Sequence, residues 1–340
     1  MEELDDTNSL YFDKHYIDND YVLAFNTTTG FELLSGVNEK PDPFVLKLPS
    51  LLDIGIMGHC ANHCEICYQG DDEEDHMELK DFINILDQVK HHTNQIALGG
   101  RGDPNKHPEF SEFLMETRRR GIVPNYTTSG NGLTYDEIQL TRTYCGAVAV
   151  SNYNKDYTYS AINRFMSVGM KTNIHYVYSR ETFEDALRLL KGEDIWKGAI
   201  DIDKLNAVIF LLFKKKGRAS NMNHLAPTAY QINLLCQAIH SKEANLKFKV
   251  GMDSCLVNHY YYFIASLTEE EKLSLDTCEA ARMSAYISPS LKMMPCSFCD
   301  PTEGISMKDK TIKDIWDNAE PFIKVRDILR KYRACCPARL

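Results

Sequence analysis

The sequence lacks a long apolar run. No stretch of its 340 residues approaches the roughly 18 to 20 apolar residues that a membrane-spanning helix needs. The acidic start MEELDDTNSLYFDKHY lacks the basic end and the apolar segment of a secretory signal. Internal repeats and low-complexity tracts are also missing. These absences predict a soluble, cytoplasmic protein without a membrane partner.

Positive charge is scarce as well. The chain has 38 Lys and Arg residues against 48 Asp and Glu residues, a formal net charge of -10 at pH 7. Proteins that bind nucleic acids use a basic surface, so we predict no nucleic-acid partner, although a local basic pocket is compatible with this balance. The chain is long enough for one large core domain and a smaller appendage.

Cysteine, by contrast, is abundant and unevenly distributed. Because cytosolic thiols stay reduced, metal binding explains the clustering of the 11 cysteines better than disulfides do. Three of them, Cys60, Cys64 and Cys67, lie in the stretch GHCANHCEICYQG. Cys145 and Cys236 are isolated, and we predict that they are small buried hydrophobic residues. The other six are Cys255, Cys278, Cys296, Cys299, Cys335 and Cys336.

Short apolar runs alternate with amphipathic segments from residue 51 onward. The apolar runs predict strands at 51–57, 95–98, 123–127, 147–150, 172–178, 207–213 and 247–251. The amphipathic segments predict helices at 77–91, 109–120, 135–142, 158–168, 181–191 and 227–241. Repeated β-α-β spacing indicates an α/β fold with a parallel sheet, either a barrel or an open sheet, whose helices cover its outer face.

The two ends of the chain follow different patterns. The stretch DYVLAFNTTTGFELL predicts a small β-hairpin, and SGVNEKPDPF resembles a linker. After residue 251 the alternation stops, six cysteines follow, and a last helix is predicted over 311–331. We therefore expect three units: a small N-terminal β lobe at 1–47, a core domain at 48–252 and a metal-stabilised extension at 253–340.

Several polar or small residues follow predicted strands. Cys60, the segment 99–102, Ser129 and Ser151 each do so, and ligands of parallel β/α folds gather at the carboxyl ends of strands. We therefore expect these residues to converge on one mouth. The run VIFLLFKKKGRAS also ends a strand. Its basic side chains are expected either to be solvated or to contact a carboxylate of a bound cofactor or of a peptide substrate.

Three neighbouring thiolates are soft ligands that suit zinc, copper(I) or iron–sulfur clusters. A four-iron cluster needs one ligand per iron, so three thiolates would leave one iron open to a small molecule. The alternative is a zinc site that a remote cysteine, His59 or His63 completes.

The pattern Cys60-x3-Cys64-x-Ile66-Cys67, just after a predicted strand, resembles the signature of the radical S-adenosylmethionine (radical SAM) enzymes. The resemblance implies a partial (β/α)6 TIM-like barrel in which the three cysteines are catalytic and bind a [4Fe-4S] cluster. In this family the open iron binds S-adenosylmethionine. An electron then cleaves the cofactor into methionine and a 5′-deoxyadenosyl radical, which abstracts hydrogen from substrate. A flavodoxin or ferredoxin is the expected electron donor.

The stretch LGGRGDPNKHPEF resembles the family's Gly-Gly-Glu-Pro motif, with Asp103 in place of the glutamate and Arg101 in place of a glycine. This resemblance implies that Gly99, Gly100 and Asp103 line the methionine end of the cofactor. An ordinary strand–helix turn is the alternative.

Two further stretches, TTSGNGL and AVAVSNY, resemble later strand ends of the family. They imply that Ser129, Asn131 and Ser151 contact the ribose or the carboxylate of the cofactor, although such residues also form ordinary turns. Tyr68 is expected either near the adenine or in the core.

The tail DTCEAARMSAYISPSLKMMPCSFC resembles the hairpin of SPASM or twitch extensions, which hold auxiliary iron–sulfur clusters. It implies one auxiliary cluster of the [4Fe-4S] type, with Cys278 and Cys296 as its first ligands. The further candidates are Cys255, Cys299, Cys335 and Cys336. A zinc site is the alternative.

The resemblance implies an oxygen-sensitive oxidoreductase, and its extension points to a maturase that crosslinks, epimerises or oxidises a ribosomally made peptide or a protein. The N-terminal lobe would bind the leader of a precursor peptide by strand addition, or else cap the barrel. Two other functions stay open: a small-molecule dehydrogenase or cofactor-biosynthesis enzyme of the same family, and a non-catalytic, zinc-stabilised binding protein.

Overall fold

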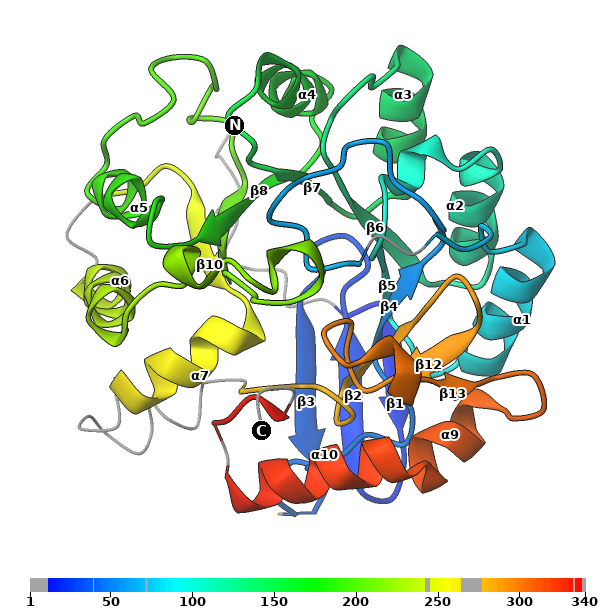
Figure 1. Cartoon of the computed structure of the whole chain (residues 1–340). Coiled ribbons are helices and arrows are strands. Elements are labelled where there is room, and N and C mark those ends of the chain that lie inside the picture. The colour runs from blue at the N-terminus through cyan, green and yellow to red at the C-terminus, as the bar shows by residue number, and fades with distance from the viewer. Residues whose placement is uncertain are drawn as a thin grey trace, which may run out of the picture.

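The computed structural model describes residues 12–38, 40–70, 73–241, 245–263, 277–332 and 334–337. These residues form a ten-stranded sheet and a separate three-stranded sheet (Figure 1). The large sheet has the order β10-β9-β8-β7-β6-β5-β4-β11-β12-β13. Its strands are β4 (Leu51–Gly55), β5 (Gln95–Gly99), β6 (Val123–Thr128), β7 (Val148–Ser151), β8 (Thr172–Tyr178), β9 (Ala207–Leu212), β10 (Lys249–Met252), β11 (Ser284–Ile287), β12 (Lys292–Met294) and β13 (Ile305–Ser306).

Six β/α units build the core, which confirms the predicted α/β fold with a partial (β/α)6 barrel. Strands β4 to β10 pair in parallel, and a helix follows each of the first six, running round the outside of the sheet (Figure 1). These helices are α1 (Leu79–Val89), α2 (Phe110–Arg119), α3 (Tyr135–Tyr144), α4 (Asp156–Ser167), α5 (Phe183–Leu190) and α6 (Ala229–Ser241). Every strand and helix predicted for this region is present.

Strand β8 illustrates how the core divides into two faces. Ile174 and Tyr176 are buried, and the hydroxyl of Tyr176 donates to the carbonyl of Thr182 next to α5, so this face packs against the helices. The alternate residues Asn173 and His175 are only half-buried and face the barrel interior. Period-two alternation therefore yields an apolar outer layer and a partly polar interior.

The C-terminal extension continues the same sheet. Strand β11 pairs in parallel with β4 and antiparallel with β12, which confirms the predicted hairpin but joins it to the barrel. A helix that the sequence did not predict, α7 (Ser254–Phe263), precedes it. The predicted helix at 311–331 is wrong in one respect, because it is divided into α9 (Ile312–Asn318) and α10 (Glu320–Lys331). Pro321 lacks the N–H that a continuous helix would require.

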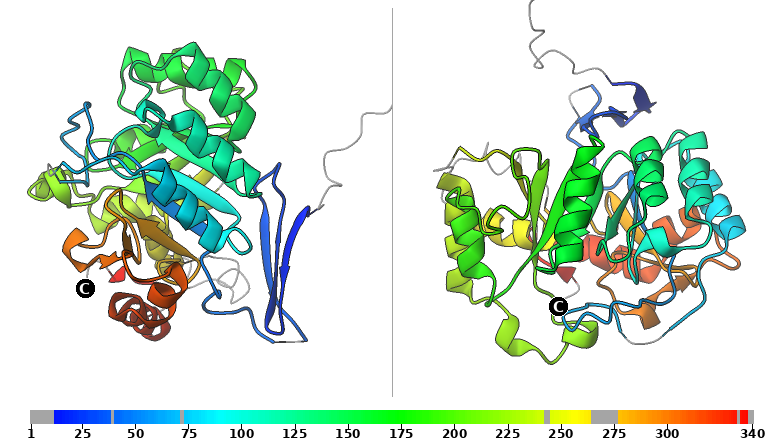
Figure 2. Two further views of the ribbon diagram at one scale, coloured as in Figure 1. Left: turned by 90° about the vertical axis from the view of Figure 1, so that its right-hand side faces the viewer. Right: turned by 90° about the horizontal axis from the view of Figure 1, so that it is seen from above.

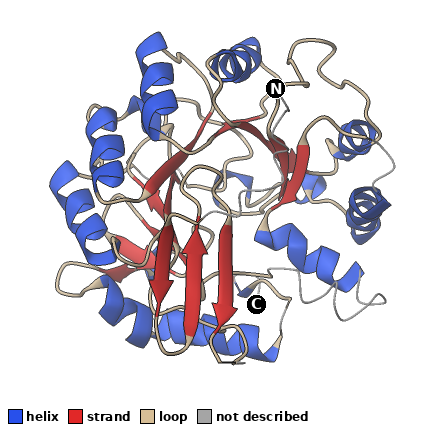
Figure 3. Cartoon of the chain, turned by 180° about the vertical axis from the view of Figure 1, so that it is seen from behind, coloured by secondary structure: helices blue, strands red, loops and turns tan. Residues whose placement is uncertain are grey.

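The N-terminal sheet lies at the amino ends of the barrel strands. It consists of β1 (Lys14–Ile17), which was not predicted, and the expected hairpin β2 (Tyr21–Phe25) and β3 (Glu32–Gly36). Lys14 Nζ donates to the carbonyl of Thr93 at 2.7 Å, and Asn94 donates to Glu32 at 2.7 Å, both just before β5. The sheet stands on the opposite side of the barrel from the cysteine loop that follows β4 (Figures 2 and 3). No described helix is both long and apolar enough to cross a membrane.

Candidate active site

Cys60, Cys64 and Cys67 lie on one loop after β4, at the carboxyl end of the parallel strands. All three thiols are half-buried. Cys64 interacts electrostatically with both others, and burial raises the pKa of its thiol. The N–H of Cys67 donates to the carbonyl of Cys64 at 3.2 Å, so the loop turns between these two cysteines. One short loop thus offers three thiolates for three irons, and its residues fit a four-iron cluster.

Two neighbouring loops support the cysteine loop. Gly102, after β5, has φ +70°, and a Cβ there would lie 2.5 Å from the carbonyl oxygen of His59. The segment after β9 approaches from the other side, where the N–H of Ala219 donates to the carbonyl of Cys67 at 3.4 Å. A glycine is required at Gly102 because only backbone fits between the two loops.

A polar network joins three of the predicted cofactor residues. Asp103 accepts hydrogen bonds from the Ser129 N–H at 2.7 Å and the Ser129 hydroxyl at 2.5 Å. The side-chain amide of Asn62 donates to Asp103 at 3.2 Å, and Asn131 donates to Asn62 at 3.0 Å. The loops after β4, β5 and β6 therefore meet, as predicted. Asn62 was missed, although its place inside the cysteine motif was a usable signal.

Ser151, at the end of β7, reaches the same mouth through a residue that the sequence reasoning missed. The hydroxyl of Tyr153 forms hydrogen bonds with both the Cys64 thiol and Ser151, and burial raises the pKa of Tyr153. Four strand ends therefore surround the cysteine loop, which leaves the predicted contacts of Ser151 and Ser129 with a nucleoside geometrically feasible.

Tyr68, Gly99 and Gly100 border the C-terminal extension. The ring of Tyr68 lies 4.6 Å from that of Phe298. Gly100 has φ +83°, and a Cβ there would lie 2.6 Å from the Tyr286 hydroxyl, whereas a Cβ on Gly99 would lie 3.1 Å from Asp53. These glycines let the turn after β5 approach β4 and β11 closely. The adenine contact predicted for Tyr68 stays a prediction.

Asp53 is a second residue that was missed. It lies on β4 between Leu52 and Ile54, which are fully buried in the outer core, so its carboxyl faces the barrel interior. Burial raises its pKa to about 7, although a hydrogen bond from Ser297 opposes this shift. An acidic residue inside an apolar strand was the available signal.

The six C-terminal cysteines come from four segments that meet. Sγ of Cys296 and Sγ of Cys299 are 3.9 Å apart, and their shared hydrogen bond raises the pKa of Cys296 and lowers that of Cys299. Cys255 shares a hydrogen bond with Cys336. Burial raises the pKa of Cys278 to about 12. Cys278 also interacts electrostatically with Cys296, Cys335 and Cys336.

This grouping offers enough thiols for an auxiliary cluster, which needs one ligand per iron. Within the described part of the chain, no three His, Cys, Asp or Glu side chains are arranged to hold a single metal ion. The two isolated cysteines, Cys145 and Cys236, are buried among apolar residues, which confirms their structural role.

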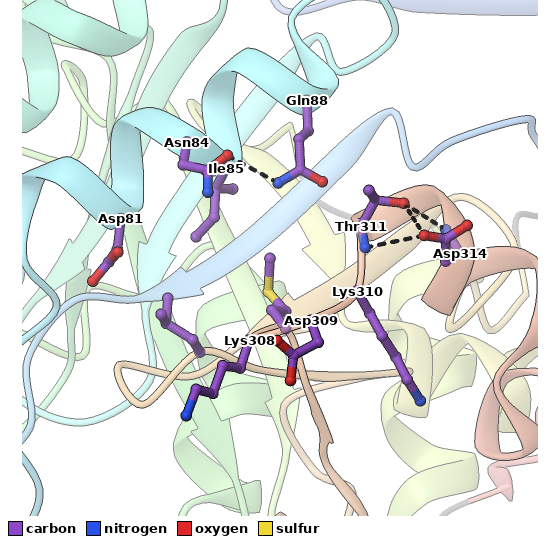
Figure 4. A pocket seen from close by; sticks show the side chains of 11 residues that line it. Asp81, Asn84, Ile85, Gln88, Lys308, Asp309, Lys310, Thr311 and Asp314 are labelled. Atoms are coloured by element: carbon purple, nitrogen blue, oxygen red, sulfur yellow. Dashed lines mark hydrogen bonds between the residues drawn. The ribbon is translucent and has the colours of Figure 1, made fainter.

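A surface hollow of about 380 Å³ lies away from these cysteines, between α1 and residues 307–314 (Figure 4). Its lining includes Asp81, Gln88 and Asp314, and it contains none of the predicted site residues. Thr311 and Asp314 form the N-terminal capping box of α9 there, so these polar groups already have a structural role.

No family model matches the chain. Crystal structures of Streptococcus suis SuiB superpose with TM-scores of 0.66, with bound S-adenosylmethionine, and 0.65, with the precursor peptide SuiA. The first has 17% identity and covers 84% of this chain and 69% of SuiB, and the second has 18% identity and covers 83% and 67%.

Two curated relatives are similar in sequence. An AdoMet-dependent heme synthase of Methanosarcina barkeri is 21% identical over 271 residues, which cover 71% of this chain and 75% of that protein. A tungsten-containing aldehyde ferredoxin oxidoreductase cofactor-modifying protein of Pyrococcus furiosus is 33% identical over 87 residues, 24% of each chain. The chain therefore has the fold of SuiB, a fold that the radical SAM enzymes share, and its three closely spaced cysteines follow the first barrel strand.

Proposed function

We propose that this protein is a radical SAM enzyme. The observation that carries the proposal is the placement of Cys60, Cys64 and Cys67 at the carboxyl end of β4, where the strand ends bearing Asp103 and Ser129 meet. A [4Fe-4S] cluster held by the three thiolates would supply the electron that cleaves S-adenosylmethionine into methionine and a 5′-deoxyadenosyl radical.

The chain's own residues would bind and orient the cofactor. Both carboxylate oxygens of Asp103 already accept protein hydrogen bonds, so we assign it mainly to fixing Ser129 and Asn62 beside the cysteine loop. Ser129 and Ser151 would donate neutral hydrogen bonds to the nucleoside. The half-buried barrel interior below this mouth, which includes Asp53, would receive the substrate.

The substrate class that we favour is a peptide or protein, acted on by crosslinking, epimerisation or oxidation. The similarity to SuiB, solved with its precursor peptide, supports this class. A second candidate, the modification of a small molecule or cofactor, is supported by the curated relatives, whose names describe heme synthesis and cofactor modification.

We also propose that residues 253–340 form a twitch-like unit that holds one auxiliary cluster, with Cys278 and Cys296 as ligands and the remaining ligands drawn from Cys255, Cys299, Cys335 and Cys336. The convergence of these cysteines supports this assignment. An auxiliary cluster at that position would accept the electron that a substrate radical loses when it is oxidised. A flavodoxin or ferredoxin would reduce the catalytic cluster.

The test is anaerobic reconstitution with iron and sulfide, followed by dithionite and S-adenosylmethionine. We expect about eight irons and eight acid-labile sulfides per chain, since each of the two cubane clusters contains four of each, and 5′-deoxyadenosine as a product. A well-loaded sample that forms no 5′-deoxyadenosine would contradict the enzymatic proposal. Zinc alone in the purified protein would favour the non-catalytic binding protein.

A further inference from the structure

Lys214 follows β9 at the barrel mouth, and it is not a solvated base. Its side chain is only 10% exposed, and its Nζ lies 2.5 Å from Asp253 Oδ2. It also donates to the carbonyl of Leu212 at 2.7 Å. The sequence left the basic run either solvated or in contact with a carboxylate of the cofactor or of a peptide substrate, whereas Lys214 contacts a carboxylate of the protein itself. A charge this buried requires such compensation.

The partner Asp253 ties Lys214 to the first cysteine-bearing segment. Oδ1 of Asp253 accepts a hydrogen bond from the N–H of Leu256 at 2.8 Å, in the first turn of α7, and Cys255 lies in that turn. The N–H of Leu212 donates to the other carboxylate oxygen at 3.2 Å. The ion pair therefore fixes the start of α7 to the end of β9.

Phe298 ties Lys214 to a second cysteine-bearing segment. The ammonium lies 4.7 Å from the centre of the Phe298 ring, a cation–π geometry, and Phe298 stands between Cys296 and Cys299. Lys214 also interacts electrostatically with the thiol of Cys255. A single buried cation thus contacts two of the segments that supply the six grouped thiols.

We propose that Lys214 is a positioning residue of the auxiliary site, which holds the Cys255 and Cys296 segments around a bound iron–sulfur cluster and raises the reduction potential of that cluster. This inference rests on the proposed function, because an auxiliary cluster is part of it. Reduction adds one negative charge to a cluster, and a cation in a low-dielectric environment stabilises that charge. The carboxylate of Asp253, being negative, lowers the reduction potential instead.

The experiment is an anaerobic redox titration, monitored by electron paramagnetic resonance, of the reconstituted full-length protein and five variants. We expect Lys214→Gln to lower the auxiliary potential, Asp253→Asn to raise it, and the double variant to lie close to wild type. Lys214→Arg keeps the charge and should keep the potential. Lys215→Gln is the matched control, since Lys215 is exposed and bonds Asn223, and it should cause no shift.

The outcomes separate this inference from the function on which it rests. Two clusters with the same auxiliary potential in wild-type and Lys214→Gln protein would overturn the role of Lys214 alone. Iron for one cluster only in the wild type would overturn the auxiliary site and this inference with it. If Lys214→Gln loses auxiliary iron, the double variant, which removes both charges of the ion pair, decides the matter. Restored iron with a near wild-type potential would support the proposal. Continued loss of iron would overturn the proposed effect of the Lys214 charge on the cluster.

Discussion

The rings of Tyr68 and Phe298 lie 4.6 Å apart, although one belongs to the first barrel loop and the other to the C-terminal extension. Tyr68 directly follows Cys67, and Phe298 directly precedes Cys299. One aromatic contact therefore joins the loop of the catalytic triplet to the segment of the auxiliary cysteines.

This contact should be measurable as a coupling energy. Replacing Tyr68 or Phe298 by Leu removes the same pair, so we expect the two changes to be non-additive by about 0.5–1.5 kcal/mol. Urea unfolding of the reduced, metal-free single and double variants measures the coupling. The matched control combines Tyr68→Leu with a change at Phe165, a core residue on α4, and should be additive. Additivity in the first cycle as well would contradict the contact.

The catalytic cysteine triplet and the C-terminal cysteines should lose iron independently. We expect Cys67→Ala to lose all 5′-deoxyadenosine formation and about four irons per chain, because a four-iron cluster is removed, while the auxiliary iron stays. Cys296→Ala should have the opposite iron phenotype. Iron and sulfide analysis of each purified variant measures this. Cys145→Ala, at a buried site outside both groups, is the control, and equal iron loss there would contradict the assignment.

Asp103 should control the affinity for S-adenosylmethionine. Asp103→Ala removes the acceptor of the Ser129 N–H and hydroxyl, and hydrogen bonds to a charged group contribute about 1.5–3 kcal/mol. We therefore expect affinity to fall roughly tenfold or more, as measured by equilibrium binding to the reconstituted protein. Asp201→Asn, an exposed carboxylate elsewhere, should leave affinity unchanged. Wild-type affinity in Asp103→Ala would show that the network does not support the cofactor site.

Asp53 should make stability depend on pH. Its pKa rises from 3.8 to about 7 on folding, so between these values the folded protein binds more protons than the unfolded chain. The free energy of unfolding therefore falls as pH rises across this window. Asp53→Asn removes that loss. The difference in free energy of unfolding between the variant and the wild type should therefore grow in favour of the variant by about 1.4 kcal/mol per pH unit across this window, to about 4 kcal/mol at most. Urea titrations of both proteins at pH 5 and pH 8 check this. The same difference in free energy of unfolding between variant and wild type at both pH values would contradict it.

The N-terminal sheet provides a test of peptide binding. If a leader adds to β3, it should pack against Leu33, which is 47% exposed. Leu33→Asp should then weaken binding of a fluorescent precursor peptide and leave 5′-deoxyadenosine formation unchanged. Ile17→Asp, on the opposite edge strand β1, is the control. Equal affinity in all three proteins would favour the alternative, in which the sheet only covers the amino end of the barrel.

The sequence predicted the barrel well because strand and helix periodicities are local signals. It also indicated which loops would converge, since the cysteine triplet, Gly99 and Ser129 each follow a strand. The contacts of Asn62 and Tyr153 could not be predicted, because they depend on distances between loops that sequence spacing does not encode. The sequence did not decide whether Lys214 is solvated or contacts a carboxylate of a ligand, because only the fold brings Asp253 beside it. The break at Ala319 follows from Pro321, whose missing N–H interrupts a continuous helix, a signal that a helical pattern can hide.

The pairing of β11 with β4 also has a consequence for biosynthesis. Leu51 and Ser284 are register partners, so β4, which is synthesised early, cannot pair with β11 until translation is nearly finished. Until then the β4 edge is an unpaired template that other chains can join, and such distant pairing is slow to form. During translation this edge is the place where a holding chaperone would protect the nascent chain.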